Sequence, residues 1–248
     1  MTHPARFPSL AAKWHVMHGS KCSKPGSRQP QRGFNLVEMA IVLVILGVLL
    51  GGLITPFSTQ LETSKRKGAE AQLQDIHDAL IGFAANNGRL PCPATAASNG
   101  LAAPNAATTA CTSAAGFVPA ATLGLNGAVD GNGFLLDPWL NPVRYTLTTA
   151  NGGAFSNVLT LGLTPDLQVC EQSGCTSVLT NTGVAVVVSP GEDGLVTASV
   201  DQLENIDGDT LFVNRVFSEL AGAEFNDHII WVSVNTLVYN LVKAGQIN

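Results

Sequence analysis

The feature that most constrains this chain is an unbroken apolar run over residues 34–54, FNLVEMAIVLVILGVLLGGLI, in which Glu38 is the single charged residue. As an α-helix, a run of this length extends about 31 Å at 1.5 Å per residue, which matches the hydrocarbon thickness of a bilayer. The pattern therefore predicts a membrane-spanning helix near the N-terminus, and the rest of the chain must fold on one side of the membrane.

Charge is divided on either side of this run. Residues 1–33 contain no acid and six of the thirteen Lys and Arg residues, namely Arg6, Lys13, Lys21, Lys24, Arg28 and Arg32. From residue 34 onward, the remaining seven basic residues face eighteen acids, a formal charge of −11. Because a basic flank stays in the cytoplasm, the later part of the chain is predicted to be exported. Its acidity argues against nucleic acid as a partner.

The cysteines follow the same division. Cys22 lies in the basic segment, and Cys92, Cys111, Cys170 and Cys175 lie beyond the apolar run. Four cysteines in an exported domain allow three pairings, of which Cys92–Cys111 with Cys170–Cys175 closes the smallest loops. A zinc site is the less favoured alternative, because neither pair has CxxC spacing and no histidine lies near either pair.

Two other kinds of N-terminal segment compete with a processed helix. A cleavable secretory signal would have a shorter apolar stretch followed by small residues of the AxA type, and neither is present. A plain signal anchor is the stronger alternative. Against it stands Glu38, because an acid at mid-bilayer costs about 2.5–3.5 kcal/mol on insertion scales and therefore requires a partner.

The residues around Gly33 carry a family resemblance. The segment 32–38, RGFNLVE, closely resembles the prepilin cleavage and methylation motif of type IV pilins and type II secretion pseudopilins. This resemblance implies that a membrane peptidase removes the leader 1–33 by cutting after Gly33 and then N-methylates Phe34. It also gives Glu38 a role in assembly, in which its carboxylate pairs with the new amine of a neighbouring subunit or of its own chain.

The helix is predicted to continue beyond the membrane. Apart from one gap near Lys65, apolar or small residues recur every three or four positions, at Leu61, Gly68 or Ala69, Leu73, Ile76, Leu80 and Phe83. Gly88, after Asn86 and Asn87, suits a left-handed C-terminal cap. We therefore expect a transmembrane helix over 34–57, an amphipathic stem over 58–87 and a globular exported domain over 88–248.

The exported domain is predicted to be rich in β-structure. Apolar, β-branched stretches at 143–148, 158–163, 184–189 and 228–234 are separated by clusters of Gly, Asn, Asp and Pro, which is typical of antiparallel strands. The segment 94–115 is dominated by Ala, Thr, Ser and Asn and is expected to be a long surface loop held by a disulfide. The fold class is therefore α+β and pilin-like, with a long N-terminal helix packed on an antiparallel sheet.

Further segments add to the family resemblance. Residues 137–145, DPWLNPVRY, resemble the DPWGNPYRY segment of pseudopilins, with Leu140 in place of the usual glycine. Trp139 is predicted to be a structural anchor that fills the gap between helix and sheet. The segments GRLPCPA, GFVPAATLGL and NDHIIW are similar to parts of larger pilin-like proteins.

Candidate metal and catalytic residues are few. Turns containing Asp130 and Asn132, and Asp207 and Asp209, supply the oxygen ligands that calcium prefers, although neither turn completes an EF-hand. Major pseudopilins bind calcium, so the resemblance makes such a site conceivable, but solvated turns are the favoured interpretation and no cofactor is expected. No serine or cysteine nucleophile is spaced with a histidine as a triad requires, and no phosphate-binding loop is present, so no enzyme is predicted.

The leading functional prediction is a structural subunit, a minor pilin or pseudopilin. The resemblance implies as partners a prepilin peptidase, other pilin or pseudopilin subunits, an inner-membrane platform protein and an assembly ATPase. The chain would cross the lipid of the bacterial inner membrane once, with a cytoplasmic N-terminus and a periplasmic C-terminal domain, before entering a filament. The alternative is a membrane-anchored periplasmic binding or enzyme module that joins no filament.

Overall fold

The computed structural model describes residues 33, 35–103, 111–194, 196 and 199–247, and of these the side chains of all but 52–58. The predicted leader and Phe34 thus lie outside the described residues, apart from Gly33. The chain divides into two compact units, Met1–Gly52 and Leu53–Asn248. The boundary falls inside the first helix, directly after the glycine pair 51–52 near the end of the apolar run.

Helix α1 (Leu36–Asn87) contributes to both units. Its portion in the first unit carries large apolar side chains on every side, and from Leu36 to Leu50 these are 44–84% exposed. A helix that is apolar all round has no polar face to present to water. This portion therefore contributes nothing to a core of its own, and its side chains are left for another molecule to cover.

The later portion of α1 buries one stripe. Ala69, Leu73, Ile76, Leu80 and Ala84 follow one another at intervals of three or four residues and are at most 3% exposed. The helix ends at Asn87, as predicted, because Gly88 adopts a left-handed conformation (φ +66°) and donates its N–H to the Ala84 carbonyl at 2.8 Å. The predicted stripe is confirmed from Ala69 to Leu80, whereas Leu61 is 54% exposed and Phe83 is only half-buried.

The second unit is built around a six-stranded sheet. Strands β1 (Ala115–Phe117), β2 (Arg144–Leu147), β4 (Val178–Ser189) and β6 (His228–Ser233) pair antiparallel in that order. The first half of β4 also pairs antiparallel with β3 (Leu167–Cys170). Strand β5 (Leu211–Val213) adds to β3 in parallel, so the sheet is mixed.

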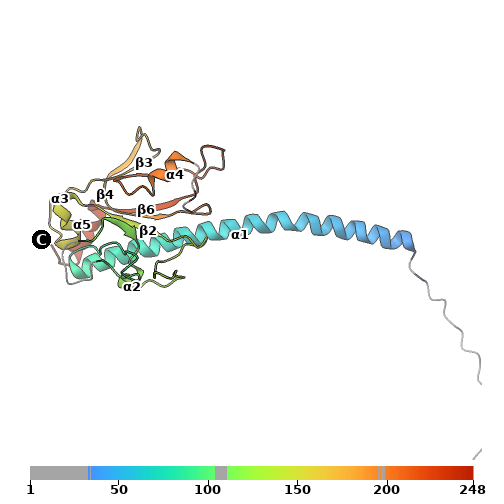
Figure 1. Ribbon diagram of the computed structural model, residues 1–248, viewed down its shortest axis with the longest axis horizontal. Helices are drawn as coiled ribbons and strands as arrows, with labels where there is room; N and C mark the ends of the chain where they lie inside the picture. The colour runs from blue at the N-terminus through green and yellow to red at the C-terminus, as the bar shows by residue number, and fades with distance from the viewer. Residues whose placement is uncertain (1–32, 34, 104–110, 195, 197–198, 248) are drawn as a thin grey trace, which may run out of the picture. The chain divides into compact units, whose positions relative to one another are not determined.

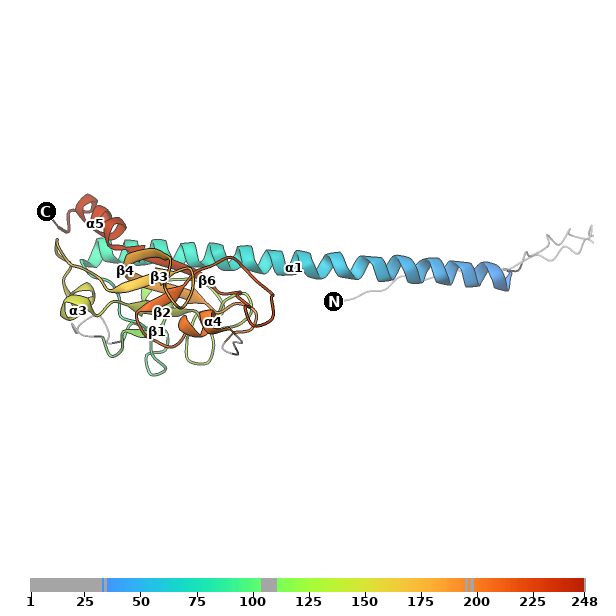
Figure 2. The same cartoon turned by 90° about the horizontal axis from the view of Figure 1, so that it is seen from above.

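Helix α1 covers one face of this sheet (Figure 1 and Figure 2). Tyr145 and Leu147 of β2, Ala185 and Val187 of β4, and Val232 of β6 form one core with Leu73, Ile76 and Leu80 of the helix. The alternate residues Val186 and Val188 point to the opposite face, where they pack with Leu167, Val169 and Phe212. Because both faces of β4 are covered, residues 184–190 are buried without interruption.

Short helices close the ends of the unit. They are α2 (Ala120–Leu123), α3 (Ala150–Asn157), α4 (Val200–Glu204) and α5 (Val234–Lys243). Helix α5 starts directly after β6, where the Ser233 hydroxyl accepts a hydrogen bond from the Thr236 N–H at 3.2 Å. It buries Leu237 and Leu241 and lies beside the last turns of α1 (Figure 1 and Figure 2).

The predicted strands are confirmed in part. Strands were expected at 143–148, 184–189 and 228–234, and β2, β4 and β6 occupy these segments. The strand predicted at 158–163 is wrong, because this segment leaves α3 as an irregular connection that turns at Gly162 (φ +85°). The expectation of a purely antiparallel sheet is also wrong, since β5 joins β3 in parallel after the long connection through β4 and α4.

Candidate functional site

Gly33 lies in an open backbone position before the first helix. It is exposed, and a Cβ atom added to it would meet nothing within 4 Å. The chain's own structure therefore imposes no need for glycine here. A requirement for glycine at this position would come from a molecule that binds this segment. A peptidase cleft that accepts an extended backbone without a side chain would impose such a requirement.

Asn35 begins helix α1. Its carbonyl accepts hydrogen bonds from the N–H groups of Glu38 at 2.9 Å and Met39 at 3.2 Å, and its side-chain oxygen accepts a longer one, 3.4 Å, from Val37. This is the arrangement of an N-cap, which satisfies donors that the first turn leaves free. The sequence interpretation overlooked this role, although an asparagine directly before an apolar helical run is the usual signal for it.

Glu38 lies in the first turn of α1 and is exposed. The partial positive charge of a helix N-terminus favours an acid at this position. That local effect accounts for an acid near the helix start, but it does not account for one inside an otherwise apolar segment. Among the described residues no cation is ion-paired with Glu38.

The residues around this junction match a known family model. Residues 28–54 match the family described as the prokaryotic N-terminal methylation motif, which is the hallmark of type IV pilins and pseudopilins. The match contains Gly33, Phe34 and Glu38. With its α1 helix packed on an α+β second unit, the chain has the organisation of a pilin-like protein, and the motif implies processing by a prepilin peptidase and assembly with other pilin subunits.

No curated protein and no solved structure is detectably similar to the chain. Among the described residues, no helix combines the length and the apolar character that crossing a membrane requires. The span predicted over 34–57 also includes Phe34 and the side chains of 52–57, which lie outside the description.

Both predicted disulfides are present in the second unit. Cys92 bonds to Cys111, and Cys170 bonds to Cys175. The first closes the segment between α1 and β1, next to the buried Leu90, and the second closes the turn after β3. This pairing was one of three possibilities. In the structure, each of the four cysteines bonds to the cysteine nearest to it along the chain.

The segment 137–145 forms a turn organised by a buried carboxylate. Asp137 is 3% exposed, and its Oδ1 accepts the N–H groups of Trp139 at 2.9 Å and Asn141 at 2.8 Å. Its Oδ2 accepts the Ser189 hydroxyl at 2.8 Å, which ties the turn to the end of β4. Leu140, where pseudopilins usually have glycine, adopts a left-handed conformation (φ +71°) that favours glycine.

Trp139 connects α1 to β6. Its indole N–H donates to both carboxylate oxygens of Glu62 on α1, at 3.2 and 3.3 Å, and its ring stacks on His228 with centroids 5.7 Å apart. It therefore lies between helix and sheet, as predicted for a structural anchor. Trp139 is half-buried, and its contacts include the charged side chain of Glu62.

The calcium candidates lie in two separate turns. Asp130 Oδ1 accepts the N–H groups of Asn132 and Phe134, both at 2.9 Å, while Asp207 accepts from Asp209, whose own carboxylate accepts from Leu211. The sequence interpretation missed Glu204, whose carboxylate lies with those of Asp207 and Asp209 inside 4.8 Å. Burial, together with these two negative neighbours and Asp201, raises the pKa of Glu204.

A second acidic group missed in the sequence is Asp227, at the start of β6. It is 7% exposed and accepts a hydrogen bond from the buried Asn205 side chain at 2.7 Å. Asn205 also exchanges hydrogen bonds with the backbone of Val213 on β5. Burial, reinforced by the negative charge of Asp193, raises the pKa of Asp227 to about 7, although hydrogen bonds from Asn205 and Gln202 oppose the rise.

Proposed function

We propose that this chain is a structural subunit, a minor pilin or pseudopilin, of a type IV pilus-like or type II secretion filament. The observation that carries the proposal is the methylation motif over 28–54, which includes the start of helix α1, where the apolar side chains are exposed. Apolar surface of this extent is unfavourable in water and marks a site of association. Lipid covers it before assembly, and the equivalent helices of neighbouring subunits cover it in the filament.

Cleavage after Gly33 gives the chain a new charged terminus. The freed and methylated amine of Phe34 remains protonated at neutral pH, and Glu38 supplies an opposite charge in surroundings of low dielectric. An unpaired charge is costly there, so a neighbour that enters the filament out of register is disfavoured. Assembly thus depends on this pair for its alignment, while the exported second unit forms the filament's surface or tip.

The remaining partners follow from the same proposal. A prepilin peptidase processes the junction, and an inner-membrane platform protein and an assembly ATPase drive extension. The chain crosses the inner membrane once, with a cytoplasmic leader and a periplasmic second unit. The resemblance of 137–145 to the pseudopilin segment favours a secretion filament over a pilus.

The proposal involves no catalytic step and no cofactor. The four cysteines beyond residue 34 form disulfides, and the ring of His228 is stacked against Trp139. The cysteines and the histidine therefore have structural roles. Calcium at the turn of Glu204, Asp207 and Asp209 is an addition to test separately. Calorimetric titration of the chelator-treated protein with calcium measures it, and the subunit role stands whichever result is found.

N-terminal mass spectrometry of the protein from its native host tests the proposal. We expect the mature chain to begin at N-methylated Phe34, and we expect Gly33→Val to leave the leader attached, because a branched side chain obstructs the peptidase. Glu38→Leu, which is processed normally, should be excluded from filaments. A mature chain that keeps residues 1–33, or a Glu38→Leu variant that enters filaments as the unaltered protein does, would instead favour a simple membrane anchor.

A further inference from the structure

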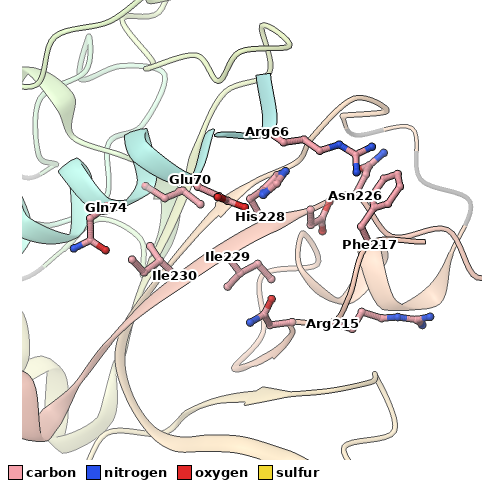
Figure 3. A pocket seen from close by; sticks show the side chains of 12 residues that line it. Arg66, Glu70, Gln74, Arg215, Phe217, Asn226, His228, Ile229 and Ile230 are labelled. Atoms are coloured by element: carbon pink, nitrogen blue, oxygen red, sulfur yellow. The ribbon is translucent and has the colours of Figure 1, made fainter. Parts of the chain in front are cut away.

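A groove of about 490 Å³ lies in the second unit between helix α1 and strand β6. One wall is formed by Arg66, Glu70 and Gln74 of α1, and the other by Arg215 and Phe217, which follow β5. The floor is the segment 226–230 (Figure 3). The groove thus has a helix on one side and the beginning of a strand along its length.

The groove follows the free edge of β6. Successive side chains of a strand point to opposite faces of its sheet, yet His228, Ile229 and Ile230 all line the groove. Three consecutive residues border one hollow when that hollow runs along the edge of the strand. Strand β6 pairs with β4 and with no other described strand, and no described loop donates a backbone hydrogen bond to it. Unpaired backbone groups of β6 therefore face the groove.

The opposite wall is suited to the side chains of an added strand. Arg66, Glu70 and Gln74 are spaced four residues apart and so project from one face of α1. Leu73 of α1 and Ile229 and Ile230 of β6 add apolar surface to the lining of the groove. A channel between a helix and an open strand edge is where extended peptides bind by strand addition, with main-chain hydrogen bonds on one side and side-chain contacts on the other.

The charges in the groove favour a basic occupant. Arg66 is paired with Glu62 at 3.4 Å and lies over the ring of Phe217, and Arg215 is paired with Asp201, so each of these cations already has a carboxylate partner. Glu70 is exposed and has no ion pair among the described residues. It points toward His228 (Figure 3), whose pKa is lowered by burial, so the imidazole is neutral at pH 7. Asp227 also lines the groove, but it is buried and accepts a hydrogen bond from Asn205, so among the described lining residues the exposed carboxylate without an ion-pair partner is that of Glu70.

We propose that this groove binds an extended segment of another polypeptide, which adds to β6 as a further strand and places a Lys or Arg side chain against Glu70. The six residues of β6 extend about 20 Å, which corresponds to a bound segment of about six residues. This goes beyond the filament role and does not depend on it, because the groove lies in the second unit and binding is measurable without assembly.

Peptide binding to the full-length chain in detergent tests the proposal. The probe is the labelled octapeptide acetyl-TVTVKVTV-amide, with acetyl-TVTVEVTV-amide and acetyl-TVTPKVTV-amide as comparisons. Fluorescence anisotropy should show the lysine peptide binding up to about fivefold more tightly than the glutamate peptide, the range of one exposed ion pair. The proline peptide should bind least, because proline lacks the ladder N–H. Residue-resolved hydrogen exchange should show slower exchange at the outer amides of 228–232 when the lysine peptide is bound.

Two charge variants separate the groove from general electrostatics. Glu70→Lys should reverse the preference, so that the glutamate peptide binds more tightly. Asp75→Lys makes the same change at an exposed position of α1 outside the groove and should leave the preference as it was. The proposal is overturned if the lysine peptide does not bind by about 1 mM, if the proline peptide binds equally, or if binding leaves exchange of β6 unchanged.

Discussion

The two portions of helix α1 show how the same residue types lead to opposite outcomes. From Leu36 to Leu50 the large apolar side chains are 44–84% exposed, whereas Ala69, Leu73, Ile76, Leu80 and Ala84 are at most 3% exposed. The first portion is apolar around its whole circumference, and the second is apolar along one stripe. A stripe can be buried by the chain's own sheet, but an apolar circumference requires other molecules. The first portion thus leaves its apolar side chains exposed, whereas the second contributes to the core of the second unit.

A pair of leucine truncations is the strongest way to break this comparison. Leu80→Ala should lower the free energy of unfolding of the second unit by about 2–5 kcal/mol, because it leaves a cavity in the core beneath the sheet. Leu43→Ala, at a position 65% exposed, should leave that free energy unchanged. Urea unfolding followed by tryptophan fluorescence measures both, and a similar loss in the two variants would contradict the division of roles.

Asp227 extends the comparison between the two portions of the molecule, because it shows that the second unit buries a titratable carboxyl group as well as apolar side chains. Its folded-state pKa of about 7 lies above the unfolded value of 3.8, so the folded state holds the proton more tightly. The stabilisation is fully present below pH 3.8 and is lost as the pH rises through about 7, a loss of up to about 4 kcal/mol.

Urea midpoints of the unaltered protein and Asp227→Asn between pH 4 and pH 8 measure this effect. The variant should lose less stability over that interval, since an amide keeps the buried position neutral. Asp75→Asn, exposed on α1, serves as the control and should follow the unaltered protein. A pH dependence unaffected by Asp227→Asn would show that another group is responsible.

The disulfides give the next effect in size, and they belong entirely to the second unit. Removing Cys92–Cys111, whose partners are 19 residues apart, should destabilise the unit by about 3 kcal/mol by the loop-entropy model. Removing Cys170–Cys175, only 5 residues apart, should cost about 2 kcal/mol. Paired alanine variants in urea measure both. The periplasmic protein should also contain no free thiol, and alkylation of these cysteines without reductant would contradict the pairing.

The smallest effect is expected at Leu140, whose left-handed backbone is a local strain inside an otherwise well-packed turn. Leu140→Gly should stabilise the second unit by about 1 kcal/mol, because glycine adopts this conformation without steric penalty and the leucine is 69% exposed. Leu161→Gly is the matched control, an exposed leucine in a turn without positive φ, and it should give no gain. Thermal melting compares the two.

The parts predicted correctly depend on local signals. The end of α1 follows from Gly88, because a left-handed residue terminates the helical hydrogen bonds wherever the sheet lies. The strand predicted at 158–163 failed because its β-branched residues and leucines fit a pleated surface only when a neighbouring strand is available, and none pairs with that segment. Strands β1, β3 and β5, three or four residues each, were too short for their alternation to be recognised.

The residues of the candidate site likewise divide into those with a local signal in the sequence and those without one. Gly33 and Glu38 are recognisable because they belong to one contiguous motif, which the sequence displays without any knowledge of distant contacts. Asp137 and Asp227 resembled ordinary acidic turn residues, since their burial depends on Ser189 and Asn205, which are 52 and 22 residues away.

By itself, the sequence determined the methylation motif, the apolar and amphipathic portions of α1 and the α+β class, and it favoured the nearest-neighbour disulfides among three possible pairings. These depend on charge, periodicity and spacing along the chain, which need no knowledge of distant contacts. Only the tertiary structure decided that β5 joins β3 in parallel, that Asp227 is buried, and that β6 leaves an open edge beside Glu70. Each of these depends on which distant segments meet when α1 covers one face of the sheet.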